Sequence, residues 1–175
     1  MIDAARVTYR DANAADAAML AEISRSTFMA TFAHLYPIAD LNAFLAQSYG
    51  EDVQGAELAD PESRFRLALM DGNAIGYAKL GAFKLPIEPI GKTVRELHRL
   101  YVVQEAKGAG VADALMRWTI EQAKAQGADT LYLGVYQGNE RAQRFYARYG
   151  FEVVGEYEFQ VGDTRDPEYI MRAPL

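Results

Sequence analysis

The residues best suited to chemistry lie between positions 100 and 115, in the run LYVVQEAKGAGVADAL. This run predicts a β-strand, a short glycine-containing turn and the first turns of a helix. The first backbone N–H groups of a helix lack partners within the helix, and the helix dipole favours negative charge beside them. A pyrophosphate is a natural ligand for such a turn. The run therefore predicts that the chain binds a phosphate-bearing cofactor.

The turn matches neither of two common phosphate motifs. The P-loop pattern G-x-x-x-x-G-K-[ST] is absent, which argues against a nucleotide hydrolase. The dinucleotide pattern G-x-G-x-x-G is incomplete, because Gly108 and Gly110 are followed by Asp113. A lone GAG between a strand and a helix marks a tight connection about as often as a ligand site. The residues around it must therefore show which of the two it is.

Hydrophobic periodicity and turn residues predict the elements that position this turn. Helices are expected over residues 13–31, 38–49, 52–58, 111–126 and 139–149. Strands are expected over residues 7–10, 64–70, 74–80, 94–103, 130–136, 151–161 and 169–172. A hairpin followed by β-α-β units implies an α/β fold with one mixed sheet and helices on both faces. Without an internal repeat or a low-complexity tract, residues 1–175 are expected to form a single domain.

Composition and charge narrow the function. The chain has no cysteine, so it forms no disulfide, thiolate metal site or cysteine nucleophile, and its two histidines, His34 and His98, are too few for a His-rich metal cluster. We therefore expect no bound metal. The net charge of −6 argues against nucleic acid as a partner. It is compatible with a cationic substrate, although mild acidity also simply aids solubility.

No targeting or membrane signal is found. No apolar run approaches the roughly 20 residues that span a bilayer, and the N-terminal residues lack the basic and then apolar profile of a secretory signal. We therefore expect a cytoplasmic protein with no membrane partner. The oligomeric state is left open, a homodimer included.

Residues 107–112 resemble the acetyl-CoA signature Q/R-x-x-G-x-G/A of the GNAT superfamily of N-acetyltransferases. Lys107 takes the first position, a departure that keeps the positive charge but loses the planar hydrogen bonding of arginine. Gly110 takes the required glycine position and Ala112 the final small one. The downstream pattern of the superfamily also matches, at Asn139, Ala142, Phe145, Tyr146, Gly150 and Phe151. Looser motifs over residues 27–33, 59–69, 133–146 and 159–163 resemble bacterial spermine/spermidine acetyltransferases, although His98 stands where a second acidic residue is expected.

The resemblance implies a fold and a cofactor. The fold is a mostly antiparallel sheet of six to seven strands, splayed at its central parallel strands, with the pantetheine arm of acetyl-CoA in the splay. The residues implied to bind acetyl-CoA are Leu100, Tyr101, Val102, Lys107, Gly108, Ala109, Gly110, Val111, Ala112, Asn139 and Arg141. The Val102 N–H would polarise the thioester carbonyl, and Arg141 would reach the phosphates unless it faces solvent.

The resemblance also implies catalytic residues. An amine has a pKa near 10 and must lose a proton before it attacks. Glu96 matches the superfamily glutamate that removes this proton. Strand alternation places Glu96, His98, Leu100 and Val102 on one face, so His98 is a second candidate base and the choice stays open. Alternatively, Glu96 pairs with Arg95 or Arg99, and His98 is a structural hydrogen-bonding residue.

Tyr146 is the implied acid that protonates the leaving thiolate. Its helix carries Ala142, Phe145, Tyr146 and Tyr149 at i, i+3, i+4 and i+7, a spacing that by itself indicates core packing. The acceptor pocket is less readable. Phe28, Phe32 and Tyr36 recur every four residues and are either core or an aromatic wall for an aliphatic cation, to which Tyr136 would add.

The sequence thus predicts an acetyl-CoA-dependent N-acetyltransferase acting on a primary amine of a small molecule, with a polyamine as first choice. With no cysteine to hold an acyl group, transfer is expected to be direct, in a ternary complex. The alternatives are an acetyltransferase for protein lysines or N-termini, and a non-catalytic acyl-CoA-binding module.

Overall fold

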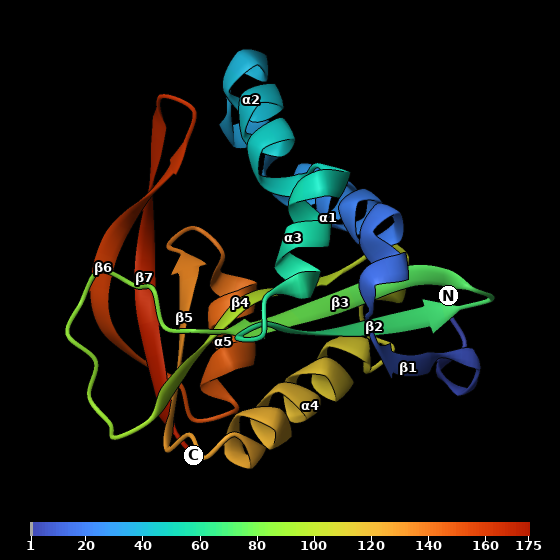
Figure 1. The fold of residues 1–175 in the computed structure, drawn as a ribbon. Coiled ribbons are helices and arrows are strands. Elements are labelled where there is room, and N and C mark those ends of the chain that lie inside the picture. Colours follow the sequence, from blue (N-terminus) through green and yellow to red (C-terminus); the bar gives the residue numbers. More distant parts are fainter. Residues whose placement is uncertain (1) are drawn as a thin grey trace.

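The structure is a computed structural model that describes residues 2–175 (Figure 1). Within this range the α-helices are α1 (Ala17–Phe32), α2 (Ile38–Tyr49), α3 (Glu51–Ala59), α4 (Val111–Ala125) and α5 (Glu140–Ala147). The strands are β1 (Thr8–Asp11), β2 (Arg64–Met70), β3 (Asn73–Gly81), β4 (Val94–Val102), β5 (Thr130–Tyr136), β6 (Glu152–Val161) and β7 (Thr164–Pro174). Short 3-10 helices include η2 (Ala14–Asp16), which precedes α1, and η3 (Ala33–Leu35), which follows it.

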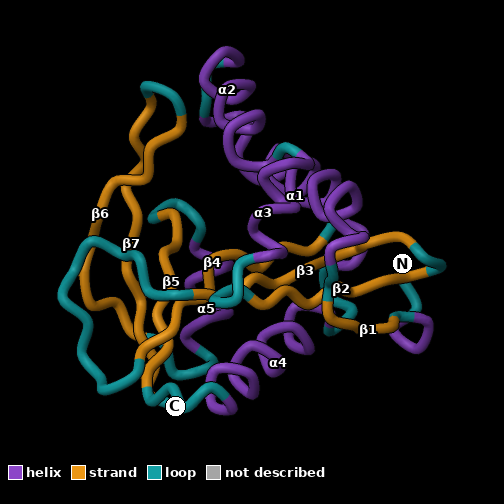
Figure 2. Tube along the Cα trace, in the orientation of Figure 1, coloured by secondary structure: helices purple, strands orange, loops and turns teal. Residues whose placement is uncertain are grey.

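The strands form one seven-stranded sheet in the order β1-β2-β3-β4-β5-β7-β6. Only the β4–β5 pair is parallel, and the other five pairs are antiparallel. Helices α1, α2 and α3 lie over one face of the sheet and α4 lies against the other (Figures 1 and 2). The largest apolar cluster joins α4 to the central strands through Leu115, Met116 and Leu131, all fully buried. The predicted mixed, mostly antiparallel sheet with helices on both faces is confirmed.

The central parallel strands pair over only part of their length. Residues Val94 to Leu97 of β4 pair with Thr130 to Leu133 of β5. Beyond these positions β4 continues to Val102 and β5 to Tyr136 without pairing to each other. The sheet is therefore splayed here, and two strand edges with unpaired backbone groups face the gap.

Strand β4 contains a β-bulge at His98, because the pairing with β3 skips this residue. The extra residue shifts the alternation of side chains, so Leu97 packs in the same apolar cluster as Leu100 and Val102. The prediction that Glu96 and His98 share a face with Leu100 and Val102 is therefore wrong. Periodicity cannot detect a bulge, because one inserted residue leaves the apolar content of a strand unchanged.

The last hairpin is longer than predicted. Strand β7 begins at Thr164, five residues before the predicted start at residue 169, and pairs with β6 from Thr164 to Arg172. Gly162, with a φ of 57°, lies in the tight turn that joins the two strands. The early part of β7 carries charged residues and Pro167, a composition that disfavours a strand. Cross-strand pairing with β6 and β5 overrides this local preference.

Two further observations concern partners outside the chain. In the range that the structure describes, no helix has the length and apolar character needed to cross a membrane. The same residues contain no group of three or more histidine, aspartate or glutamate side chains gathered closely enough to hold a metal ion.

Candidate active site

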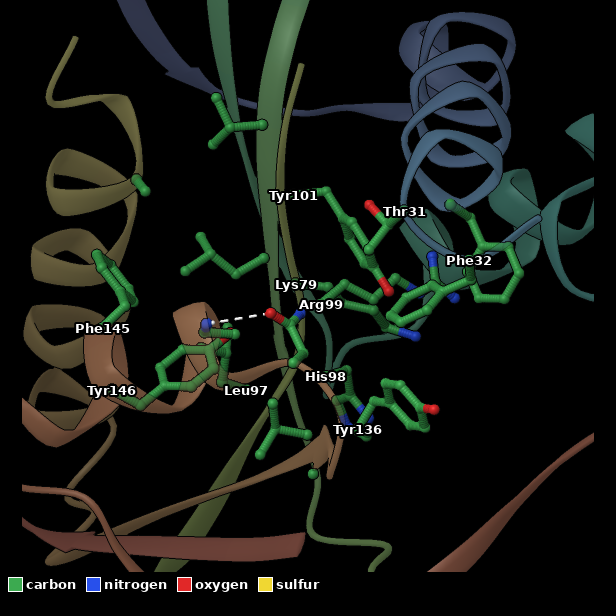
Figure 3. Close-up of a pocket in the computed structure, with 18 of the residues that line it drawn as sticks. Thr31, Phe32, Lys79, Leu97, His98, Arg99, Tyr101, Tyr136, Phe145 and Tyr146 are labelled. Atoms are coloured by element: carbon green, nitrogen blue, oxygen red, sulfur yellow. Dashed lines mark hydrogen bonds between the residues drawn. The ribbon is translucent and has the colours of Figure 1, made fainter. Parts of the chain in front are cut away.

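A cavity of about 1030 Å3 opens where β4 and β5 splay apart. Every residue predicted from the sequence to act in catalysis, cofactor binding or acceptor binding lines it, except Ala109. The N–H of Ala109 donates to the carbonyl of Ala106 and closes the turn that carries its neighbours. Figure 3 shows Phe145 and Tyr146 on one side of this cavity and Phe32, Tyr101 and Tyr136 on the other.

The turn before α4 offers unpaired donors to this cavity. Gly108 and Gly110 have φ angles of 86° and 80°, a left-handed conformation that residues with a Cβ rarely adopt. Within residues 2–175, no acceptor binds the backbone N–H groups of Gly108, Gly110, Val111, Ala112 or Asp113. The turn thus fits a pyrophosphate, which can accept several of these hydrogen bonds at the positive end of α4.

Two cationic side chains meet beside the turn. Lys107 and Arg141 both line the cavity, although one precedes α4 and the other lies in the first turn of α5. Partial burial lowers the pKa of Lys107, and the nearby Arg141 guanidinium lowers it further. The two like charges repel each other unless an anion lies between them. Their placement therefore favours a ligand that carries phosphate groups.

The splayed edge of β4 presents backbone donors to the same cavity. The N–H of Val103 donates to the carbonyl of Ile75 on β3. Successive N–H groups of a strand point to opposite edges, so the N–H of Val102 points away from β3 and into the splay. An extended ligand chain or a carbonyl oxygen placed in the splay would find this donor unpaired.

Tyr146 faces the cavity from α5. Asn139 caps this helix, with its Oδ1 accepting from the N–H of Ala142 at 3.2 Å. Tyr146 is 9% exposed, and within residues 2–175 its hydroxyl has no hydrogen-bond partner. Burial raises the pKa of Tyr146, and the nearby Glu168 carboxyl raises it further. The hydroxyl is therefore protonated at neutral pH and available to a ligand.

Glu96 and His98 line the cavity but are engaged with the protein. Glu96 is 6% exposed, and its carboxylate accepts from the backbone N–H of Lys84 at 2.9 Å and lies 3.0 Å from Nδ1 of His98. Nε2 of His98 lies 2.9 Å from the carbonyl oxygen of Ala82. Because both ring nitrogens face oxygen atoms, neither presents a free lone pair to the cavity.

The ion pairs considered for Glu96 do not form. Arg95 pairs with Glu62 instead, at 2.8 Å, and Arg99 forms a bidentate pair with Glu57. Lys79 adds a second cation to the same Glu57 carboxylate at 3.2 Å. The two pairs with Glu57 hold α3 against the sheet, and none of the three pairs involves Glu96.

Aromatic rings form the wall opposite the turn. Phe28 is 2% exposed, stacks on Tyr36 with ring centroids 6.2 Å apart, and packs against Phe32 at 5.0 Å. Phe32 in turn meets the edges of Tyr101 and Tyr136 at 6.5 and 6.2 Å. Phe28 therefore belongs to the core, and the other rings present an apolar surface to the cavity.

The chain matches the family model described as the acetyltransferase (GNAT) family over residues 19–151. The chain belongs to the GNAT family. This confirms the family resemblance read from residues 107–112 and from the region around Tyr146. The protein is accordingly an acyltransferase whose acetyl donor is acetyl-CoA, and the unpaired amides and paired cations described above fit the phosphates of that cofactor.

Relatives and solved structures agree with this family. The chain is 31% identical over 153 residues to an uncharacterized N-acetyltransferase of Lactobacillus delbrueckii, which covers 87% of this chain and 88% of the relative. It is 39% identical over 114 residues to an uncharacterized N-acetyltransferase of Mycobacterium tuberculosis, covering 65% and 69%. The PaiA N-acetyltransferase of Thermoplasma acidophilum, solved with coenzyme A, has a TM-score of 0.77 and 20% identity, covering 97% and 99%.

Sequence reasoning missed two carboxyl groups of β7 in this GNAT enzyme: Glu168, which lines the cavity, and Asp166, two residues before it on the same strand. Both are buried, with exposed fractions of 7% and 9%. The hydroxyl of Tyr36 donates to Asp166, whereas Glu168 makes no side-chain hydrogen bond or ion pair within residues 2–175. The only available signal was their i, i+2 spacing, which has meaning only once residues 164–168 are known to be a strand.

Proposed function

We propose that this GNAT enzyme acetylates a primary amine of a small, positively charged molecule, with polyamines as the first candidates. The observation that carries the proposal is the layout of one cavity. Its cofactor end has unpaired amides and the cations Lys107 and Arg141, and its other end has aromatic rings and the buried carboxyl group of Glu168, with the buried Asp166 two residues away on the same strand. An aliphatic ammonium ion is attracted by both carboxylates and ring faces.

Bound acetyl-CoA supplies an activated acetyl group and a thiolate leaving group. Lys107, Arg141 and the unpaired amides of Gly108, Gly110, Val111 and Ala112 hold its phosphates in this proposal, and Asn139 contacts the pantetheine arm. The N–H of Val102 stabilises negative charge on the carbonyl oxygen as it develops. Leu100 and Tyr101, which precede Val102 on β4, line the cavity beside it.

Tyr146 is proposed as the acid that protonates the departing sulfur. Its unpartnered, protonated hydroxyl supports this role. Glu96, the base implied by the family resemblance, and His98, the second candidate base, both remain in this proposal, and the 3.0 Å between the Glu96 carboxylate and Nδ1 of His98 would let them act only as a linked pair. Direct transfer in a ternary complex is proposed because the chain has no cysteine to carry the acyl group.

Two relatives support a small-molecule acceptor. The chain is similar to an L-methionine sulfoximine/L-methionine sulfone acetyltransferase of Pseudomonas aeruginosa and to an aminoalkylphosphonate N-acetyltransferase of Salmonella typhimurium. Both names describe acceptors with an amine and an anionic or strongly polar group. Neither is a polyamine, so these compounds belong in any acceptor screen beside spermidine and spermine.

Thiol release from acetyl-CoA in the presence of an amine panel tests the proposal. The panel contains spermidine, spermine, L-methionine sulfone, an aminoalkylphosphonate, and peptides with a free N-terminus or a lysine. We expect turnover with a polyamine and slower or no turnover with the peptides. Turnover with peptides alone would establish the protein-modifying alternative. Tight coenzyme A binding without any turnover would establish a binding module. The cytoplasmic location and a homodimer stay predictions.

A further inference from the structure

Glu168 occupies an unusual position in the sheet. It lies on β7 in register with Tyr136 of β5 and Tyr157 of β6, so a tyrosine flanks it on each neighbouring strand. It is 9% exposed and lines the cavity. Within residues 2–175, no hydrogen-bond donor, lysine, arginine or histidine pairs with its carboxyl group. A buried carboxyl group without a partner is costly to ionise and is uncommon in proteins.

The groups around Glu168 are acidic or neutral. They are Asp166 on the same strand and the hydroxyls of Tyr36, Tyr101, Tyr146 and Tyr157, which come from the segment after α1 and from β4, α5 and β6. Burial raises the pKa of each of these tyrosines, and the Glu168 carboxyl raises it further. Glu168 thus acts electrostatically on both the proposed acid Tyr146 and the aromatic end of the cavity.

Burial and the neighbouring Asp166 raise the pKa of Glu168 from its ordinary value of 4.5 to about 8. A cation beside the carboxyl group would lower this pKa again, because an opposite charge favours the ionised form. The protein supplies no such cation, whereas an ammonium ion of the acceptor would. A carboxyl group that titrates near neutral pH is also well matched to accepting a proton from an amine.

The other two candidate bases are less free to act. Glu96 already accepts a hydrogen bond from the Lys84 N–H and lies 3.0 Å from Nδ1 of His98, and His98 faces an oxygen atom with each ring nitrogen. Glu96 influences the pKa of Tyr157 alone among the four cavity tyrosines named above, whereas Glu168 influences all four. Glu168 is therefore the carboxyl group with both an unoccupied acceptor and a place beside Tyr146.

We propose that Glu168 binds the ammonium group of the acceptor and takes the proton that its nitrogen must lose. This inference rests on the proposed function and names a residue for it. One proton moves from nitrogen to a Glu168 oxygen, and the freed lone pair forms the N–C bond to the thioester carbon. As the C–S bond breaks, its electron pair stays on sulfur, which takes a proton from Tyr146. The nitrogen loses its second proton to water, Tyr146 regains one, and Glu168 returns its own.

The variants Glu168→Gln and Glu156→Gln test this role. Gln keeps the shape of the side chain and removes its charge and basicity. Glu156 is an exposed carboxylate on the adjacent β6 that does not line the cavity, so it is the matched control. We expect Glu168→Gln to lower kcat/KM by about 100-fold or more. We also expect it to abolish the rise of kcat/KM toward about pH 8 and to leave coenzyme A affinity unchanged. Glu168→Asp keeps a carboxylate at a shorter reach and should retain the rise with pH.

The outcomes separate this inference from the proposed function. If an amine is acetylated and Glu168→Gln stays within about threefold of wild type with the same pH profile, Glu168 has no such role and the function stands. If no amine is acetylated, the proposed function fails, and binding of spermidine to the coenzyme A complex is measured by calorimetry. Wild-type binding that weakens by about 30-fold in Glu168→Gln supports the ammonium site. Equal binding by both proteins, or no binding by wild type, overturns it.

Discussion

Tyr146 illustrates how burial at a single residue determines what a side chain can do. Its ring packs between Phe145 and Phe151, with centroids 5.4 and 5.9 Å away, whereas its hydroxyl has no hydrogen-bond partner within residues 2–175. Burial and the nearby Glu168 raise its pKa, so it remains a proton donor across the neutral range. Packing and chemistry thus use different atoms of one side chain, and a variant can separate them.

Tyr146→Phe keeps the ring and removes only the hydroxyl. We expect kcat to fall by about 100-fold because the leaving sulfur loses its proton donor. The dissociation constant for coenzyme A and the melting temperature should change little, since no protein hydrogen bond is lost. Steady-state kinetics and calorimetry measure these quantities. Tyr9→Phe, on β1 and outside the cavity lining, is the control and should leave kcat unchanged. Unchanged kcat in Tyr146→Phe would remove this residue from the mechanism.

Glu168 should also make the stability of the free enzyme depend on pH. Its pKa is raised to about 8 in the folded state, so between about pH 4.5 and 8 the folded protein holds a proton that the unfolded chain has released. Wild-type stability therefore falls as pH rises through this range. Glu168→Gln removes the effect, so its gain over wild type should grow by roughly 2–4 kcal/mol between about pH 5 and 8.5. Denaturant unfolding at both pH values measures it, and parallel behaviour of the two proteins would contradict the raised pKa.

The site residues differ in how far sequence could predict them. Gly110, Asn139 and Tyr146 belong to local patterns of fixed spacing, so a family resemblance identifies them without a structure. Glu168 belongs to no such pattern. Its significance arises from burial, from the absence of a partner and from strands that are distant in sequence, and these properties exist only after the sheet has formed. Glu96 was predicted as a catalytic base and lines the cavity, but its position 3.0 Å from Nδ1 of His98 depends on a bulge that periodicity cannot detect.

At the scale of elements, the turn before α4 is the part of the fold most directly built for binding. A left-handed glycine directs several amides toward one point at the start of α4. Strand β4 splays from β5 just before this turn, so the same strand supplies the Val102 N–H and leads the chain to the donors at α4. A change in the turn's backbone should therefore affect cofactor binding more than it affects stability.

Gly110→Ala and Gly72→Ala test this point as a matched pair. Both glycines have a φ of 80°, and a Cβ at either would meet no atom within 4 Å. Each substitution should therefore destabilise the fold by a similar amount, about 1–2 kcal/mol, through backbone strain alone. Only Gly110→Ala should weaken coenzyme A binding, by about tenfold, because Gly72 lies in the remote β2–β3 turn. Melting curves and calorimetry distinguish the two effects, and equal coenzyme A affinity in both variants would contradict the assignment of the turn.

Elements were predictable where local and global preferences agree. The helix that became α4 has apolar residues at helical spacing and an ending at Gly127, and its predicted bounds differ from the observed ones by one residue. The β2–β3 hairpin was marked by Asp71-Gly72. The strand predicted for β7 was too short, because the charged first half of β7 has no local strand preference and is ordered only by pairing with β5 and β6.

At the scale of the whole molecule, charge is unevenly distributed although the net charge is −6. Lys107, Arg141, Arg144 and Arg148 line the cofactor side of the cavity, and Glu168 lines its other end, with the buried Asp166 two residues away on β7. An anionic cofactor and a cationic acceptor are therefore attracted to opposite ends of one cavity. Long-range attraction of this kind weakens with salt, because mobile ions screen exposed charges.

Lys107→Met and Arg141→Met test whether the cations at the cofactor end hold phosphate. Methionine keeps much of the length of either side chain and removes its charge. Each variant should raise the dissociation constant for coenzyme A by about tenfold at low salt, and the loss should shrink as salt is added, because screening already weakens the wild-type attraction. Both residues are exposed, so melting temperatures should stay close to wild type.

Lys124→Met is the matched control for this pair, since Lys124 is an exposed lysine in the last turn of α4, at the opposite end from the cofactor turn. It changes the net charge by the same amount as either test variant and should leave coenzyme A affinity unchanged. An equal loss in Lys124→Met would mean that total charge, rather than its placement, governs binding. Arg141 lowers the pKa of Lys107 in the free protein, because the two positive charges repel each other. Each single variant already relieves this repulsion. The double variant should therefore lose less free energy of coenzyme A binding than the sum of the two single losses.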